Sequence, residues 1–271
     1  MNEKEIYIKI LQWLNNKKEV AIANVIETWG SSPRPVGSIM AINSDHDIIG
    51  SVSGGCVENF VFGKALEVIK NNNVETLEFG VTNSKAWEVG LTCGGKIKVF
   101  LEKISHKDID FIKKVNDVYT KNETMVIATR LNDGQRDIFD NTEANKSKTK
   151  FKIDFNTIKS SIRLLDNQEW FLKVFQNNAK IIIIGAVHIA EPLINFANHL
   201  NYEVFLIDPR STFNEKKFNN IKIFKEWPDD ALKKIIIDQN TAIVTLTHDP
   251  KLDDPALEYS LKTDAFYIGC L

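Results

Sequence analysis

The C-terminal third of the sequence alternates short apolar runs with amphipathic stretches, and this alternation restricts the fold more than any other feature. It begins with four isoleucines at 181–184. Such runs are typical of buried strands, and strands that alternate with helices build a parallel sheet with right-handed crossovers. The sequence therefore predicts a Rossmann-like, doubly wound domain over residues 177–271. Its strands are expected at 181–184, 204–207, 221–224, 242–246 and 265–268, and its helices at 188–200, 229–236 and 254–261.

Residues 1–176 lack this regular alternation, and we interpret them as an N-terminal α+β domain. Apolar residues at helical spacing predict an opening helix, and strands are expected on both sides of a proline-rich turn. A polar, charged stretch at 132–150 predicts an exposed excursion. Helices are expected at 3–15, from about 57 to 69 and at 108–119, and strands at 20–28, 38–42, 48–53, 75–81, 97–101 and 124–130.

Composition limits the classes of partner. The 271 residues are 43% hydrophobic, which suits two folded domains. A net charge of -2 without a long basic run argues against nucleic acid, and no apolar stretch is long enough for a membrane span. Three scattered cysteines and the lack of a signal peptide predict a cytoplasmic protein. We interpret Trp29, Trp87 and Trp227 as packing anchors, since no basic stripe surrounds them.

A glycine turn at Gly54-Gly55 lies between an expected strand and an expected helix. Unpaired amides and the positive end of the helix dipole converge at such a turn, so it can bind an anion. Cys56 follows at the helix start, where a thiolate is favoured. The alternative interpretation is a plain tight turn with a small buried cysteine.

Cys93-Gly94-Gly95 repeats this combination of a thiol with two glycines. Arg34 adds a cation on the proline-stiffened loop. Together these residues indicate a site for a phosphate-bearing ligand with a soft centre, because thiolates suit a soft metal or a persulfide. This hypothesis assumes that the segments converge in space.

In the second domain, residues 185–190 lie where a dinucleotide-binding fingerprint is expected, directly after the first strand. The motif is degraded, because Val187 replaces the glycine that lets a pyrophosphate approach the backbone. Asp208 and Arg210 are placed to hold a ribose or a phosphate. The carboxyl edge of the sheet is expected to carry a set of cofactor-binding residues. The alternative is that the histidines there only cap helices or face solvent. A third option is a metal site formed by two histidines and an aspartate. The set is Gly185, His188, Asp208, Arg210, His248 and Asp249, and the metal option uses His188, Asp208 and His248.

Several longer stretches resemble the XdhC/CoxI family of xanthine dehydrogenase accessory proteins. They cover both domains in the family's order and are more specific than any single glycine pattern. The stretches are ETWGSSPRPVGS at 27–38, GSVSGGCVE at 50–58, WEVGLTCGG at 87–95, GAVHIA at 185–190, IDPR at 207–210 and LTHDPKLDDPA at 246–256.

The resemblance implies a non-catalytic chaperone that binds molybdenum cofactor, as molybdopterin or its cytosine dinucleotide. It also implies support for sulfuration of the cofactor and its insertion into a xanthine dehydrogenase or CO-dehydrogenase-type hydroxylase. Cys93 would contact the metal and its sulfur, Cys56 would rank second, and Gly54, Gly55 and Arg34 would cradle phosphate.

The implied partners are a molybdenum hydroxylase apoenzyme and a cysteine desulfurase. A homodimer is also expected, because open sheets and exposed tips commonly mediate dimers. Relatives continue beyond the segment equivalent to 267–269, so a truncated Rossmann-like domain is expected. The competing hypothesis is an NAD(P)-dependent oxidoreductase that works at Gly185, Asp208 and His248, although Val187 disfavours NAD(P). A third is a regulatory interaction protein without a cofactor.

Overall fold

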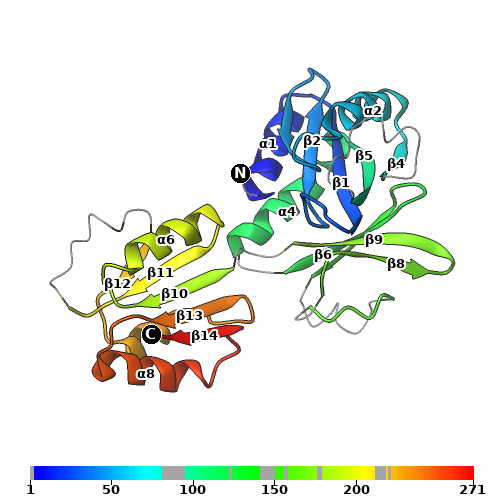
Figure 1. Ribbon diagram of the computed structural model, residues 1–271. Coiled ribbons are helices and arrows are strands. Elements are labelled where there is room, and N and C mark those ends of the chain that lie inside the picture. The colour runs from blue at the N-terminus through cyan, green and yellow to red at the C-terminus, as the bar shows by residue number, and fades with distance from the viewer. Residues whose placement is uncertain are drawn as a thin grey trace. The chain divides into compact units, whose positions relative to one another are not determined.

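The computed structural model describes residues 3–80, 95–121, 124–140, 150–155, 158–175, 179–210, 218 and 221–271. The chain divides into two compact units, Met1–Asn177 and Asn178–Leu271 (Figure 1). The first unit contains two sheets and the second contains one. No helix in the described ranges has the length and apolar character that crossing a bilayer requires.

The first sheet of unit 1 is antiparallel throughout, in the order β3-β2-β1-β5-β4. One face is covered by a helix whose apolar side packs on the central strands. Two further helices pack on the other face. The strands are β1 (Val20–Trp29), β2 (Ile39–Asn43), β3 (Ile48–Gly50), β4 (Val74–Phe79) and β5 (Lys96–Ile104), and the helices are α2 (Glu58–Asn71) on the first face and α1 (Glu3–Asn15) and α4 (Ile109–Lys121) on the second.

Strand β1 contains a bulge that changes which face its residues occupy. Val25 pairs with Val99 of β5, whereas Glu27 pairs with Lys98, so Ile26 is the additional residue. Val25 packs in the core beneath α2. Beyond the bulge, Glu27 lies with Lys98 on the opposite face, because a bulge re-aims the side chains that follow it.

The second sheet of unit 1 has the order β7-β6-β9-β8 and is also antiparallel. It corrects two sequence expectations. Residues 132–150 are predicted to be an exposed excursion, but part of this stretch pairs with β6 as a strand, and two strands after residue 160 are not predicted at all. The strands are β6 (Met125–Arg130), β7 (Arg136–Asp140), β8 (Ser161–Leu165) and β9 (Gln168–Phe175).

Ion pairing explains why the polar segment at 136–140 is not a solvated loop. The Arg136 guanidinium donates to Glu102 Oε2 at 2.6 Å and to Asp108 Oδ1 at 2.8 Å. Glu102 is buried and Arg136 is largely so. A charged side chain such as Arg136 can therefore be largely buried in strand β7, because it is paired with two carboxylates.

Unit 2 contains a parallel sheet in the order β12-β11-β10-β13-β14, which confirms the Rossmann-like, doubly wound prediction. Helix α6 covers one face, and α7 and α8 cover the other. The elements are β10 (Lys180–Ile184), α6 (Ala190–His199), β11 (Glu203–Ile207), β12 (Lys222–Phe224), α7 (Pro228–Leu232), β13 (Thr241–Thr245), α8 (Pro250–Ser260) and β14 (Tyr267–Cys270).

Helix α8 begins four residues before the predicted start. Asp249 is its N-cap and accepts a hydrogen bond from the Lys251 amide at 3.1 Å, and Pro250 occupies the first helical position. Both residues are typical of a helix start, so the signal was present in the sequence.

Candidate functional site

The Gly54-Gly55 turn surrounds a carboxylate from the protein itself. Glu58, the first residue of α2, accepts hydrogen bonds from the amides of Ser53 at 2.8 Å, Gly54 at 3.0 Å and Gly55 at 2.8 Å. The hydroxyls of Ser51 and Ser53 donate to it at 2.8 and 2.5 Å. The sequence analysis assigns the Gly54 and Gly55 amides to a phosphate, but both already donate their hydrogen bonds to Glu58.

These hydrogen bonds determine the charge state of Glu58. Burial alone would raise the pKa of its carboxyl group, but the hydrogen bonds from Ser53 and Ser51 outweigh burial and lower the pKa to about 2. Glu58 is therefore an anion throughout the physiological range. Cys56, between this turn and the helix, is half-buried and packs against the core under α2.

The loop from Ser31 to Gly37, which carries Arg34, lies against the Gly54-Gly55 turn and against Gly95. A Cβ added to Gly54 would lie 4.0 Å from Pro33 Cβ, and a Cβ added to Gly95 would lie 2.3 Å from the Ser31 carbonyl oxygen. Only glycine permits the second approach. The segments that the sequence singled out therefore meet at one end of the first sheet, where the Arg34 side chain is exposed.

Cys93 and Gly94 lie outside the described residues. Cys93 is joined to Gly95 through one intervening residue.

A buried lysine fixes the base of this loop. Lys173 of β9 donates to the Gly37 carbonyl oxygen at 2.7 Å and to Asn24 Oδ1 at 3.2 Å, and it pairs with Glu3 at 2.5 Å. Burial lowers the pKa of the Lys173 ammonium, against the opposing effect of Glu3. Because Lys173 connects β9, β1 and α1, it holds the loop in register with both sheets.

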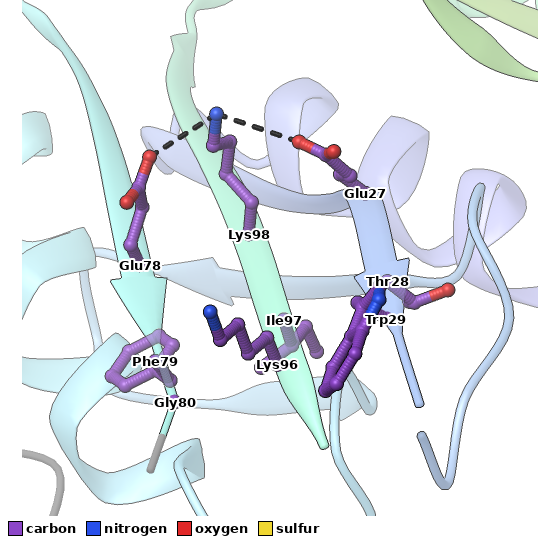
Figure 2. Close-up of a pocket in the computed structure, with 9 residues that line it drawn as sticks. All are labelled: Glu27, Thr28, Trp29, Glu78, Phe79, Gly80, Lys96, Ile97 and Lys98. Atoms are coloured by element: carbon purple, nitrogen blue, oxygen red, sulfur yellow. Dashed lines mark ion pairs between the residues drawn. The ribbon is translucent and has the colours of Figure 1, made fainter. Parts of the chain in front are cut away.

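Next to the loop is a pocket of about 220 Å³ on the first sheet (Figure 2). Trp29 is 68% exposed there, and the Lys96 ammonium lies 5.6 Å from its ring centroid. Trp29 is thus not a packing anchor, and neither is Trp227, which is 51% exposed. Sequence reasoning missed Trp29 and Lys96 as site residues; an aromatic residue beside a glycine-rich loop was the available signal.

The glycine turn of unit 2 is closed by an acidic residue. Asp208 is 1% exposed; its Oδ2 accepts from the Ala186 amide at 2.7 Å and from the Arg210 guanidinium at 2.6 Å. Its Oδ1 accepts from the Arg210 amide and Nε, both at 2.9 Å. Burial would raise the pKa of Asp208, but the bonds from Arg210 and Ala186 lower it. Asp208 and Arg210 therefore satisfy each other.

The remaining predicted residues of unit 2 have different surroundings. His188 and His248 are both exposed, and Asp249 caps α8. No group of three His, Cys, Asp or Glu side chains that could hold a metal ion occurs among the described residues, so the metal option at His188, Asp208 and His248 is wrong. Gly185 is required by the fold, with φ +108° and Thr247 packed against it.

Two curated proteins are similar to this chain over nearly its whole length. The chain is 22% identical over 268 residues to a probable xanthine dehydrogenase subunit from Bacillus subtilis strain 168, covering 95% of this chain and 81% of that protein. It is 22% identical over 265 residues to the molybdenum cofactor insertion chaperone PaoD of Escherichia coli strain K12, covering 95% and 68%.

A crystal structure described as a xanthine dehydrogenase from Bacillus halodurans has the same fold. It superposes with a TM-score of 0.74 at 24% identity, over 98% of this chain and 81% of that one. Residues 13–80 match the XdhC and CoxI family, and residues 181–271 match the XdhC Rossmann domain. The chain therefore belongs to the XdhC and CoxI family.

Proposed function

We propose that this protein is an accessory chaperone that binds molybdenum cofactor and delivers it to a molybdenum hydroxylase such as a xanthine dehydrogenase. Family membership supports this proposal, as does the alignment of 95% of the chain with a relative named as a molybdenum cofactor insertion chaperone. The cofactor is the cargo of such a protein rather than a resident group.

The observation that carries the proposal is the meeting of three motifs at one end of the first sheet. The Arg34 loop contacts the turn that precedes Cys56 and the glycine that follows the Cys93-Gly94 pair. A molybdenum cofactor combines a phosphate with a soft metal and sulfur centre. Cations beside thiols on rigid turns suit that combination.

The structure suggests a division of roles within this site. Arg34 supplies positive charge for the phosphate, in place of the Gly54 and Gly55 amides, which already donate to Glu58. The glycine turn then serves to hold Cys56 in position. Cys93 remains our first choice for contact with the metal and its sulfur, and Cys56 the second.

We extend the proposal to support of sulfuration, with a cysteine desulfurase as sulfur donor and a homodimer as the working form. Thiols can receive sulfur as persulfides, which is the chemistry that sulfuration requires. NAD(P) turnover in unit 2 has less support, because Asp208 is buried against Arg210 and Val187 replaces the fingerprint glycine.

Coexpression with the cofactor pathway and a hydroxylase, followed by native mass spectrometry, tests the proposal. We expect the wild-type protein to carry molybdenum and a pterin, and Cys93→Ala to lose them. Cys270→Ala is the matched control, since Cys270 is an exposed thiol in unit 2. Retention of the cofactor by a Cys56→Ala, Cys93→Ala double variant would contradict the thiol roles, and a wild-type protein without cofactor would contradict the function.

A further inference from the structure

The pocket of Figure 2 is built on a grid of side chains from three neighbouring strands. In the first row, Lys98 of β5 lies between Glu27 of β1 and Glu78 of β4, with its ammonium 3.5 and 3.1 Å from their carboxylates. In the second row, Trp29 pairs with Lys96. Gly80 ends this row, next to the Lys96 side chain.

The same face of β5 is covered over most of its length but open at this end. Glu102 is paired with Arg136 of the second sheet, and Phe100 packs on Phe171. Toward the N-terminal end of β5, the next residues on this face are Lys98, which is partly exposed, and Lys96, which is exposed. The second sheet thus stops short of the Lys96 row, and a rigid strand presents an indole ring to the space left open.

Charge and size restrict what can occupy this space. Among the described residues Lys96 forms no ion pair, so its charge is available to an anion. Glu27 and Glu78 are 60% and 65% exposed and keep lone pairs free for N–H donors. The volume of about 220 Å³ is below the roughly 300–1,000 Å³ of pockets for drug-sized ligands, so it admits one ring system rather than a dinucleotide.

We infer that this pocket binds the pterin ring of the cargo, stacked on Trp29. A 2-amino-4-oxopyrimidine edge offers paired N–H donors to a carboxylate and a carbonyl oxygen to an ammonium, as Glu78 and Lys96 supply. The indole face supplies stacking, and the phosphate side extends toward Arg34. The choice of pterin rests on the proposed function, because guanine has the same edge.

Fluorescence titration of the full-length protein with pterin-6-carboxylate tests the inference, with guanosine monophosphate as the second ligand. Trp29→Ala should weaken pterin-6-carboxylate binding about tenfold or more, since aromatic stacking on a base has that magnitude. Trp29→Phe should retain most of the affinity, and Lys96→Gln should weaken binding and reduce its salt dependence. Trp227→Ala is the control, an exposed tryptophan of unit 2.

Three results would overturn the inference: no binding to the wild-type protein at millimolar ligand, equal affinity of the Trp29→Ala variant, or equal or tighter binding of guanosine monophosphate. Because Trp29 is exposed, its removal leaves the core intact, which circular dichroism verifies. Molybdenum content is measured separately. A protein that carries molybdenum but is insensitive to Trp29→Ala refutes the pocket alone, whereas Trp29-dependent pterin binding without cofactor refutes the chaperone function alone.

Discussion

Replacing Glu58 by Gln should destabilise unit 1 and alter its response to acid. The pKa of Glu58 is about 2, against an ordinary value of 4.5. At about 1.4 kcal/mol for each unit of pKa, this difference corresponds to about 3 kcal/mol. Because the carboxylate is partly exposed, solvent screening reduces this to about 1–2 kcal/mol of unfolding free energy.

The pH dependence has a definite sign. A carboxylate with a lowered pKa stabilises the folded state above its unfolded pKa, and this contribution disappears as the pH falls through the folded pKa. The wild-type protein should therefore exceed Glu58→Gln in stability by a constant amount above about pH 5. The difference should shrink between about pH 4.5 and pH 2.

Urea unfolding monitored by tryptophan fluorescence measures this difference. A Trp227→Phe background places all remaining tryptophans in residues 1–177, so the signal reports unit 1. Glu67→Gln is the matched control on the same helix, since Glu67 is an exposed partner of Lys64 and its loss should cost no more than about 0.5 kcal/mol. Equal midpoints for Glu58→Gln and Glu67→Gln at pH 7, or a difference that persists unchanged to pH 2, would refute the reasoning.

Three further outcomes are expected. Gly185→Ala should destabilise unit 2 by about 2–3 kcal/mol in thermal unfolding, because φ is +108° and the new Cβ would lie 2.5 Å from Thr247 Cγ2; wild-type stability would contradict this. Arg136→Met should cost unit 1 about 3–5 kcal/mol in urea unfolding by leaving Glu102 buried without its partner, and a loss below 1 kcal/mol would show that Glu102 finds another. Millimolar NAD should leave the thermal midpoint unchanged because both Asp208 oxygens are engaged, whereas a rise of several degrees would revive the dinucleotide alternative.

The parallel sheet of unit 2 was predictable because its strands are continuous apolar runs separated by helical patterns. Strand β7 was not, because a charged residue such as Arg136 is ordinarily exposed, and its partner Glu102 lies 34 residues away in the chain. The β8–β9 hairpin did carry a local signal. Its turn residues Asp166 and Asn167 both have positive φ, at 51° and 59°, and Asp and Asn are favoured at such positions.

The candidate site was predictable as a set of segments but not as a set of contacts. Glycine, proline and cysteine marked the turns that meet near Gly95. Which anion would occupy the Gly54 turn depended on a side chain a few residues further along, and proximity in sequence does not reveal that Glu58 turns back onto the loop. Trp29 was misjudged because its face depends on the bulge, which leaves no reliable trace in a single sequence.

The bulge in β1 has a consequence for how this surface could arise or be lost. A strand alternates its faces residue by residue, so the one additional residue at Ile26 exchanges inside and outside for everything after it. If the strand kept its length but lost the bulge, Ile26 would pair with Lys98 and Trp29 would turn toward the helix-covered core, with the motifs on the neighbouring loops unaltered. Deletion of the Ile26 codon would instead remove the bulge and leave Trp29 opposite Lys96. A relative with a strand of this length therefore presents an aromatic ring here only if it also keeps the bulge, even when it shares all of those motifs.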